Sequence, residues 1–66
     1  MTLEQAAEWL LKIRDLSDDD ENAHSEEDHF REAVLQAIAN GTTTEPIALA
    51  TIALKTSELR FARLFS

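Results

Sequence analysis

The sequence predicts an all-α fold, a compact bundle of three helices plus a short C-terminal helix. Helix-forming Ala, Leu and Glu are abundant, and one Gly and one Pro in 66 residues leave little of the punctuation that hairpins need. A hydrophobic content of 44% is too high for a disordered chain. The length predicts a single small helical domain over residues 1–66, whose core is marginal for its size.

The first helix is expected over about residues 3–16. Thr2 and Gln5 have the spacing of a capping box, in which each side chain accepts a hydrogen bond from the other residue's backbone N–H. Apolar residues cover an arc of about 220° on this helix, wider than the stripe of roughly 100° that one core requires. Trp9 and Leu11 lie at opposite edges of the arc. The helix therefore either packs between two others or uses one edge to bind a second molecule.

An acidic block occupies residues 15–32. It contains nine of the 13 Asp and Glu residues and a single base, so its charge is −8, against −7 for the whole chain. We expect an acidic loop over residues 17–24, because adjacent Asp residues repel one another and are poor helix formers. Ser25 is the expected N-cap of the second helix, with Glu26, Glu27 and Asp28 in its first turn, where carboxylates favour the positive end of the helix dipole.

The second helix is expected over about residues 26–40, where the clearest amphipathic spacing of the chain occurs. Its apolar stripe follows i, i+3, i+4, i+7 and i+8 and consists of Phe30, Ala33, Val34, Ala37 and Ile38. Gly41 follows the last turn and is the expected left-handed residue that ends the helix.

The third helix is expected over about residues 45–55. It is apolar on nearly all sides, which is typical of a central helix that is buried by its neighbours. Thr43 or Thr44 is the expected N-cap, and Pro46 falls in the first turn, where its missing N–H costs nothing.

Two continuations after residue 55 are open: a fourth helix over residues 58–65, or a third helix that continues with a bend. We favour the fourth helix, because Phe61, Leu64 and Phe65 then share one face. The predicted core consists of Leu3, Ala6, Leu10, Ile13, Phe30, Val34, Ala37, Ile38, Ile47, Ala50, Leu54, Phe61 and Phe65.

The acidic loop resembles a calcium-binding EF-hand in two frames, starting at Asp15 and at Asp18. Such a loop needs Gly at its sixth position, where these frames have Asp20 and Ala23, and the second frame has His29 in place of the terminal Glu. Zinc sites usually need four nitrogen or sulfur ligands, but the chain has two His and no Cys. We therefore expect no specific metal site and no cofactor, and weak binding of a divalent cation stays open.

The sequence predicts no catalytic residue and no enzyme activity, because it lacks a Gly-rich phosphate loop, a Cys and a G-x-S-x-G motif. A charge of −7 opposes direct binding to nucleic acid or anionic lipid. No apolar run approaches the roughly 18 residues of a membrane span, and Glu4 and Glu8 are unlike a secretory signal. The expected location is the cytoplasm.

The leading expectation is a non-enzymatic acidic module that binds a protein partner. Carboxylates held on a rigid helix can imitate the charge of nucleic acid and bind the basic site of a nucleic-acid-binding protein or enzyme. The expected partner-binding residues are Asp18, Asp19, Asp20, Glu21, Glu26, Glu27 and Glu32. The alternative is a structural homo-oligomer, such as a homodimer, that associates through Trp9, Leu11 and Leu35, while the acids serve solubility and helix capping.

In its size, acidity and lack of catalytic motifs, the chain is similar in type to the small acidic helical proteins that phages and mobile elements encode. Some of those proteins inhibit host nucleic-acid enzymes by charge mimicry. The similarity implies an inhibitory role for the acidic face.

Overall fold

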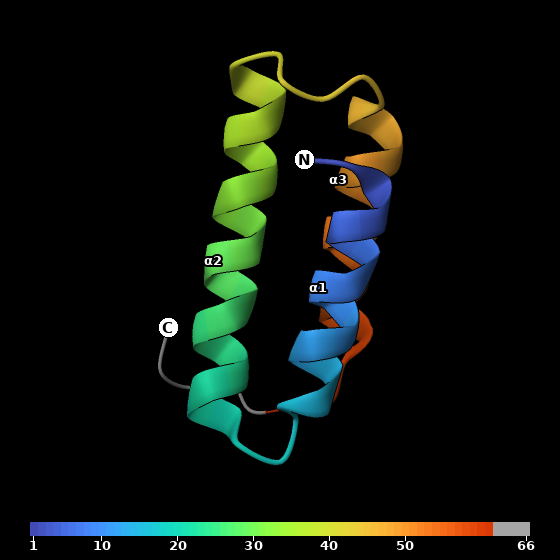
Figure 1. Cartoon of the computed structure of the whole chain (residues 1–66). Helices are drawn as coiled ribbons and strands as arrows, with labels where there is room; N and C mark the ends of the chain where they lie inside the picture. The colour runs from blue at the N-terminus through green and yellow to red at the C-terminus, as the bar shows by residue number, and fades with distance from the viewer. Residues whose placement is uncertain (62–66) are drawn as a thin grey trace.

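The computed structural model of the chain describes residues 1–61. Three α-helices and a 3-10 helix follow one another: α1 over Leu3–Asp15, α2 over Asp20–Ala39, α3 over Pro46–Leu54 and η1 over Lys55–Glu58. Helices α1 and α2 run antiparallel, and α3 packs against both of them (Figure 1). No strand occurs within this part of the chain, so the predicted all-α bundle is confirmed.

The start of α1 follows from the predicted capping box. The backbone N–H of Thr2 donates to Gln5 Oε1 at 3.0 Å, and the backbone N–H of Gln5 donates to Thr2 Oγ1 at 3.1 Å. These two bonds satisfy donors that the first turn leaves without a partner inside the helix. The helix ends at Asp15, one residue before the expected end.

Helix α2 begins at Asp20, so the expected loop over residues 17–24 and the expected cap at Ser25 are wrong. The N-cap is Asp19, which accepts from the backbone N–H of Asn22 at 3.3 Å and from its side-chain amide at 2.7 Å. Ala23 and His24 are buried, so the early turns of α2 are held by packing as well as by the cap. Burial and capping together outweigh the repulsion between adjacent acids.

The ends of the α2–α3 connection match the sequence in part. Gly41 has a φ of 70°, the left-handed conformation that glycine adopts without strain, which confirms its predicted role after α2. Pro46 is the first residue of α3, as expected. The expected Thr cap is wrong, because Glu45 is the N-cap and its side chain makes no capping bond. The Thr43 hydroxyl instead accepts from the Glu45 backbone N–H at 3.3 Å.

The chain continues directly from α3 into η1. The hydroxyls of Thr56 and Ser57 donate to the carbonyls of Ala53 and Leu54 at 2.9 and 2.8 Å, which tightens the backbone into a 3-10 turn. Leu59 is extended, with a ψ of 144°, so the expected helix over residues 58–65 is wrong up to residue 61. The rest of that expected helix, and Phe65 of the predicted core, lie outside the described residues.

The core is a single cluster between the three helices. Its buried members are Ala6, Ile13, Phe30, Val34, Ala37 and Leu49. The predicted core positions Ile47 and Leu54 are wrong, because they are 84% and 68% exposed, whereas Leu49 is fully buried. A helix that is apolar on all sides gives no indication of which side faces inward, so the packing against α1 and α2 decides it. No helix within residues 1–61 is both long enough and apolar enough to cross a membrane.

Candidate protein-interaction surface

An exposed row of carboxylates follows the outer side of α2 and the turn before it. We call this row the acidic ridge and define it by its five exposed acids: Asp18, Asp19, Glu21, Asp28 and Glu32. Residues 21, 28 and 32 are seven and four positions apart, so they fall within an arc of about 40° on the helix. The turn places the first two acids at the N-terminal end of the same helix.

The ridge carboxylates keep their negative charge facing solvent. None of them pairs with a Lys or Arg side chain within residues 1–61. Asp28 lies 3.4 Å from Nε2 of His24, a contact that becomes an ion pair only when the imidazole is protonated. Glu32 accepts from the Gln36 amide at 3.4 Å, a contact that leaves its charge unchanged.

Glu26, an expected partner-binding residue, is used inside the fold. Its Oε2 accepts from the indole Nε1 of Trp9 at 2.9 Å and lies 3.6 Å from the Lys12 ammonium. The indole also packs against Phe30, with ring centroids 5.2 Å apart. This arrangement joins α1 to α2, and it directs the Glu26 carboxylate towards α1 and away from a partner.

Two other expected binding residues are not on the open surface. Glu27 is buried, with 3% of its surface exposed, and Asp20 is half-buried at the start of α2. The expected residues Asp18, Asp19, Glu21 and Glu32 are all exposed. Asp28 was missing from the expectation, although its side chain is 64% exposed. Its spacing from residues 21 and 32 would have identified it had the helix been expected to begin at residue 20.

The expected apolar contact residues are placed differently from one another. Trp9 packs against the core and is engaged by Glu26, so its ring is largely used within the molecule. Leu11 is 47% exposed on α1, and Leu35 is 66% exposed on α2. These three side chains therefore do not form one continuous apolar surface.

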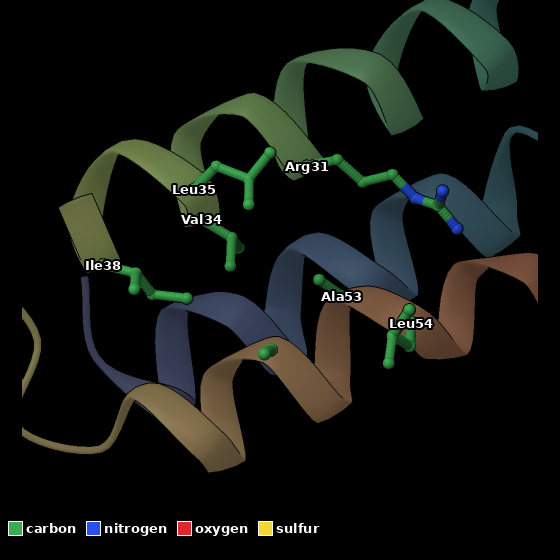
Figure 2. A pocket seen from close by; sticks show the side chains of 7 residues that line it. Arg31, Val34, Leu35, Ile38, Ala53 and Leu54 are labelled. Atoms are coloured by element: carbon green, nitrogen blue, oxygen red, sulfur yellow. The ribbon is translucent and has the colours of Figure 1, made fainter.

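An apolar groove with a volume of about 260 Å³ lies between α2 and α3. Figure 2 shows the lining side chains facing one another from the two helices: Arg31, Val34, Leu35 and Ile38 from α2, and Ala50, Ala53 and Leu54 from α3. Arg31 is the one charged residue of this lining, and its Nε donates to Thr56 Oγ1 at 2.9 Å. That bond fixes the guanidinium at the η1 end of the groove.

No group of three or more potential metal ligands is assembled within residues 1–61. The buried His24 has no hydrogen-bond partner for either ring nitrogen in that range, since its contact with Asp28 lacks hydrogen-bonding geometry. The geometry of the surface therefore offers carboxylates and an apolar groove as its chemically distinctive features.

Comparisons with models of protein families, with curated proteins and with solved structures find no match to this chain.

Proposed function

We propose that the protein is a non-enzymatic interaction module whose acidic ridge binds a basic site on another protein. The observation that carries the proposal is the alignment of Glu21, Asp28 and Glu32 on one exposed side of a continuous helix, with no Lys or Arg neutralising them. A rigid row of charges loses little side-chain freedom on binding and attracts a basic partner over long range.

The spacing of the ridge supports a target that normally binds nucleic acid. The ridge holds five carboxylates over roughly 20 Å, about one charge per 4 Å. One strand of B-DNA carries a phosphate about every 3.4 Å along the helix axis. A groove that binds a single phosphate strand through Lys and Arg would therefore encounter a similar charge density on this helix. The protein would act as an inhibitor of the type that phages encode, on a cytoplasmic nucleic-acid-binding protein or enzyme.

The proposal is tested by neutralising the ridge without changing the fold. The ridge variant is Glu21→Gln/Asp28→Asn/Glu32→Gln, which leaves the cap Asp19 intact. The control variant, Glu4→Gln/Glu8→Gln/Glu58→Gln, removes the same charge from exposed positions outside the ridge. Both variants have a net charge of −4 in place of −7, so they differ only in where the charge is lost.

We expect immobilised wild-type protein and the control variant to capture the same basic protein from a native lysate, and the ridge variant to lose it. Added duplex DNA should displace the captured protein, and the association rate should fall with rising salt. Equal capture by both variants would contradict the role of the ridge. Capture that survives an excess of DNA would contradict the mimicry of nucleic acid.

A further inference from the structure

Helix α3 has an exposed apolar face that the bundle does not use. Ile47, Ala50, Thr51 and Leu54 have the spacing i, i+3, i+4, i+7, so they share one side of the helix. Ile47 is 84% exposed and Leu54 is 68% exposed, although both are large apolar residues. This face continues into the α2–α3 groove, because Ala50 and Leu54 also line the groove (Figure 2).

The α3 face differs from the other exposed apolar position, Leu11, in its surroundings. No charged residue occurs anywhere in Pro46–Leu54. Leu11, by contrast, has Glu8 and Asp15 three and four positions away on α1. Contiguous apolar surface next to a groove is typical of a protein contact, whereas a single exposed Leu among charges is ordinary.

From this face we infer that two copies of the chain associate through α3, antiparallel, about a two-fold axis between Ala50 and Thr51. Ile47 and Leu54 are equally far from that midpoint, so the axis brings each Ile47 level with Leu54 of the other copy. The small side chains at the centre allow the two helices to approach closely. Each Ile47 then lies beside the partner's α2–α3 groove and fills its open side.

The charges at the two ends of α3 favour a second copy in this orientation. Glu45 precedes the helix and Lys55 follows it, both are exposed, and neither forms an ion pair within residues 1–61. An antiparallel pair places the Lys55 of each copy about one residue, roughly 1.5 Å, from the level of the other Glu45. Arg31 is held at the Lys55 end by Thr56, and these two bases outweigh Glu58 there. A parallel pair would place like charges together.

The strong net charge does not prevent this association. On α2 the acidic ridge lies about 90° around the helix from the residues that line the groove, so it faces away from the contact. The ridge therefore stays available for a different partner when two copies are joined.

The expected contact is small and the dimer is correspondingly weak. Helix α3 has nine residues and is about 13–14 Å long, which places the interface among small, transient ones. Sedimentation equilibrium of the full chain should show the mass rising from 7.4 kDa towards twice that value, with a Kd on the order of 100 µM. A mass that stays at 7.4 kDa up to about 2 mM protein would overturn the inference.

Two matched variants locate the contact. Ile47→Ser should raise the Kd at least tenfold, while the helical circular dichroism and Tm stay the same, because Ile47 contributes little to the monomer core. Leu11→Ser, at 47% exposure on α1, should leave the Kd unchanged. The opposite result, with Leu11→Ser dissociating the dimer and Ile47→Ser leaving it intact, would overturn the α3 contact. The ridge variant should still dimerise, which separates a failure here from a failure of the proposed function.

Charge reversal tests the antiparallel orientation independently of the apolar residues. Glu45→Lys alone and Lys55→Glu alone should each raise the Kd about tenfold, because each places like charges together at both ends of the contact. An equimolar mixture of the two variants should regain the wild-type Kd as a heterodimer, since Lys then faces Glu at both ends. Wild-type Kd values for both single variants would overturn the antiparallel arrangement.

Discussion

The contact between Trp9 and Glu26 predicts that the acid cluster contains a carboxylate essential for stability. The Glu26 side chain is 26% exposed and accepts the indole N–H at 2.9 Å. A hydrogen bond to a charged group contributes about 1.5–3 kcal/mol, and the partial exposure favours the lower end of that range. The Lys12 contact adds only about 0.3 kcal/mol, because the Lys12 side chain is 64% exposed.

Glu26→Ala should therefore lower the free energy of unfolding by about 1.5–2 kcal/mol. A 66-residue domain has a total of roughly 3–10 kcal/mol, so this loss is a large fraction. With a urea dependence of about 1 kcal/mol per molar, the midpoint falls by about 1.5–2 M. The measurement is urea unfolding followed by the fluorescence of Trp9, the single Trp of the chain, and by circular dichroism.

The matched control for this prediction is Glu8→Ala on α1. It makes the same chemical change at an exposed helical position, so any effect of helix propensity cancels between the two variants. We expect it to change the free energy of unfolding by less than about 0.5 kcal/mol. A double-mutant cycle of Trp9→Phe and Glu26→Gln should give a coupling of about 1 kcal/mol. Equal losses for Glu26→Ala and Glu8→Ala would refute the reasoning.

Two further predictions concern the packing and capping of α2. Phe30→Ala removes a fully buried ring and should cost about 3–5 kcal/mol, enough to unfold much of the protein, whereas Leu35→Ala, at a position 66% exposed, should cost less than about 1 kcal/mol; thermal unfolding by circular dichroism measures both, and equal Tm values would contradict the assigned core. Asp19→Ala removes the cap of α2 and should cost about 1 kcal/mol, with faster hydrogen exchange at the Asn22 amide; unchanged exchange there would show that the cap contributes nothing.

The acidic block has two physical roles that the structure separates. Glu26 and Glu27 are held within the fold, one by Trp9 and Lys12 and the other by burial. The acids of the ridge face solvent from a continuous helix. This division explains why the proposed binding surface contains fewer than half of the 13 acidic residues of the chain.

Local chemistry in the sequence determined several parts of the fold. The bonds between Thr2 and Gln5 involve residues three positions apart, so their spacing alone predicts the start of α1. The left-handed Gly41 and the initial Pro46 follow from backbone constraints of single residues. The stripe of Phe30 and Val34 fixes which side of α2 is buried, because polar residues separate its turns.

Only the tertiary structure decided which of several locally acceptable choices was used. Asp19 and Ser25 can both cap a helix, and the burial of Ala23 and His24 favours the earlier start. Helix α3 is apolar on every side, so the neighbouring helices select Leu49 for the core and leave Ile47 exposed. Local signals depend on residues within one turn, whereas these choices depend on contacts between residues far apart in the chain. The two surfaces proposed for binding, the acidic ridge and the face of α3, both result from those distant contacts.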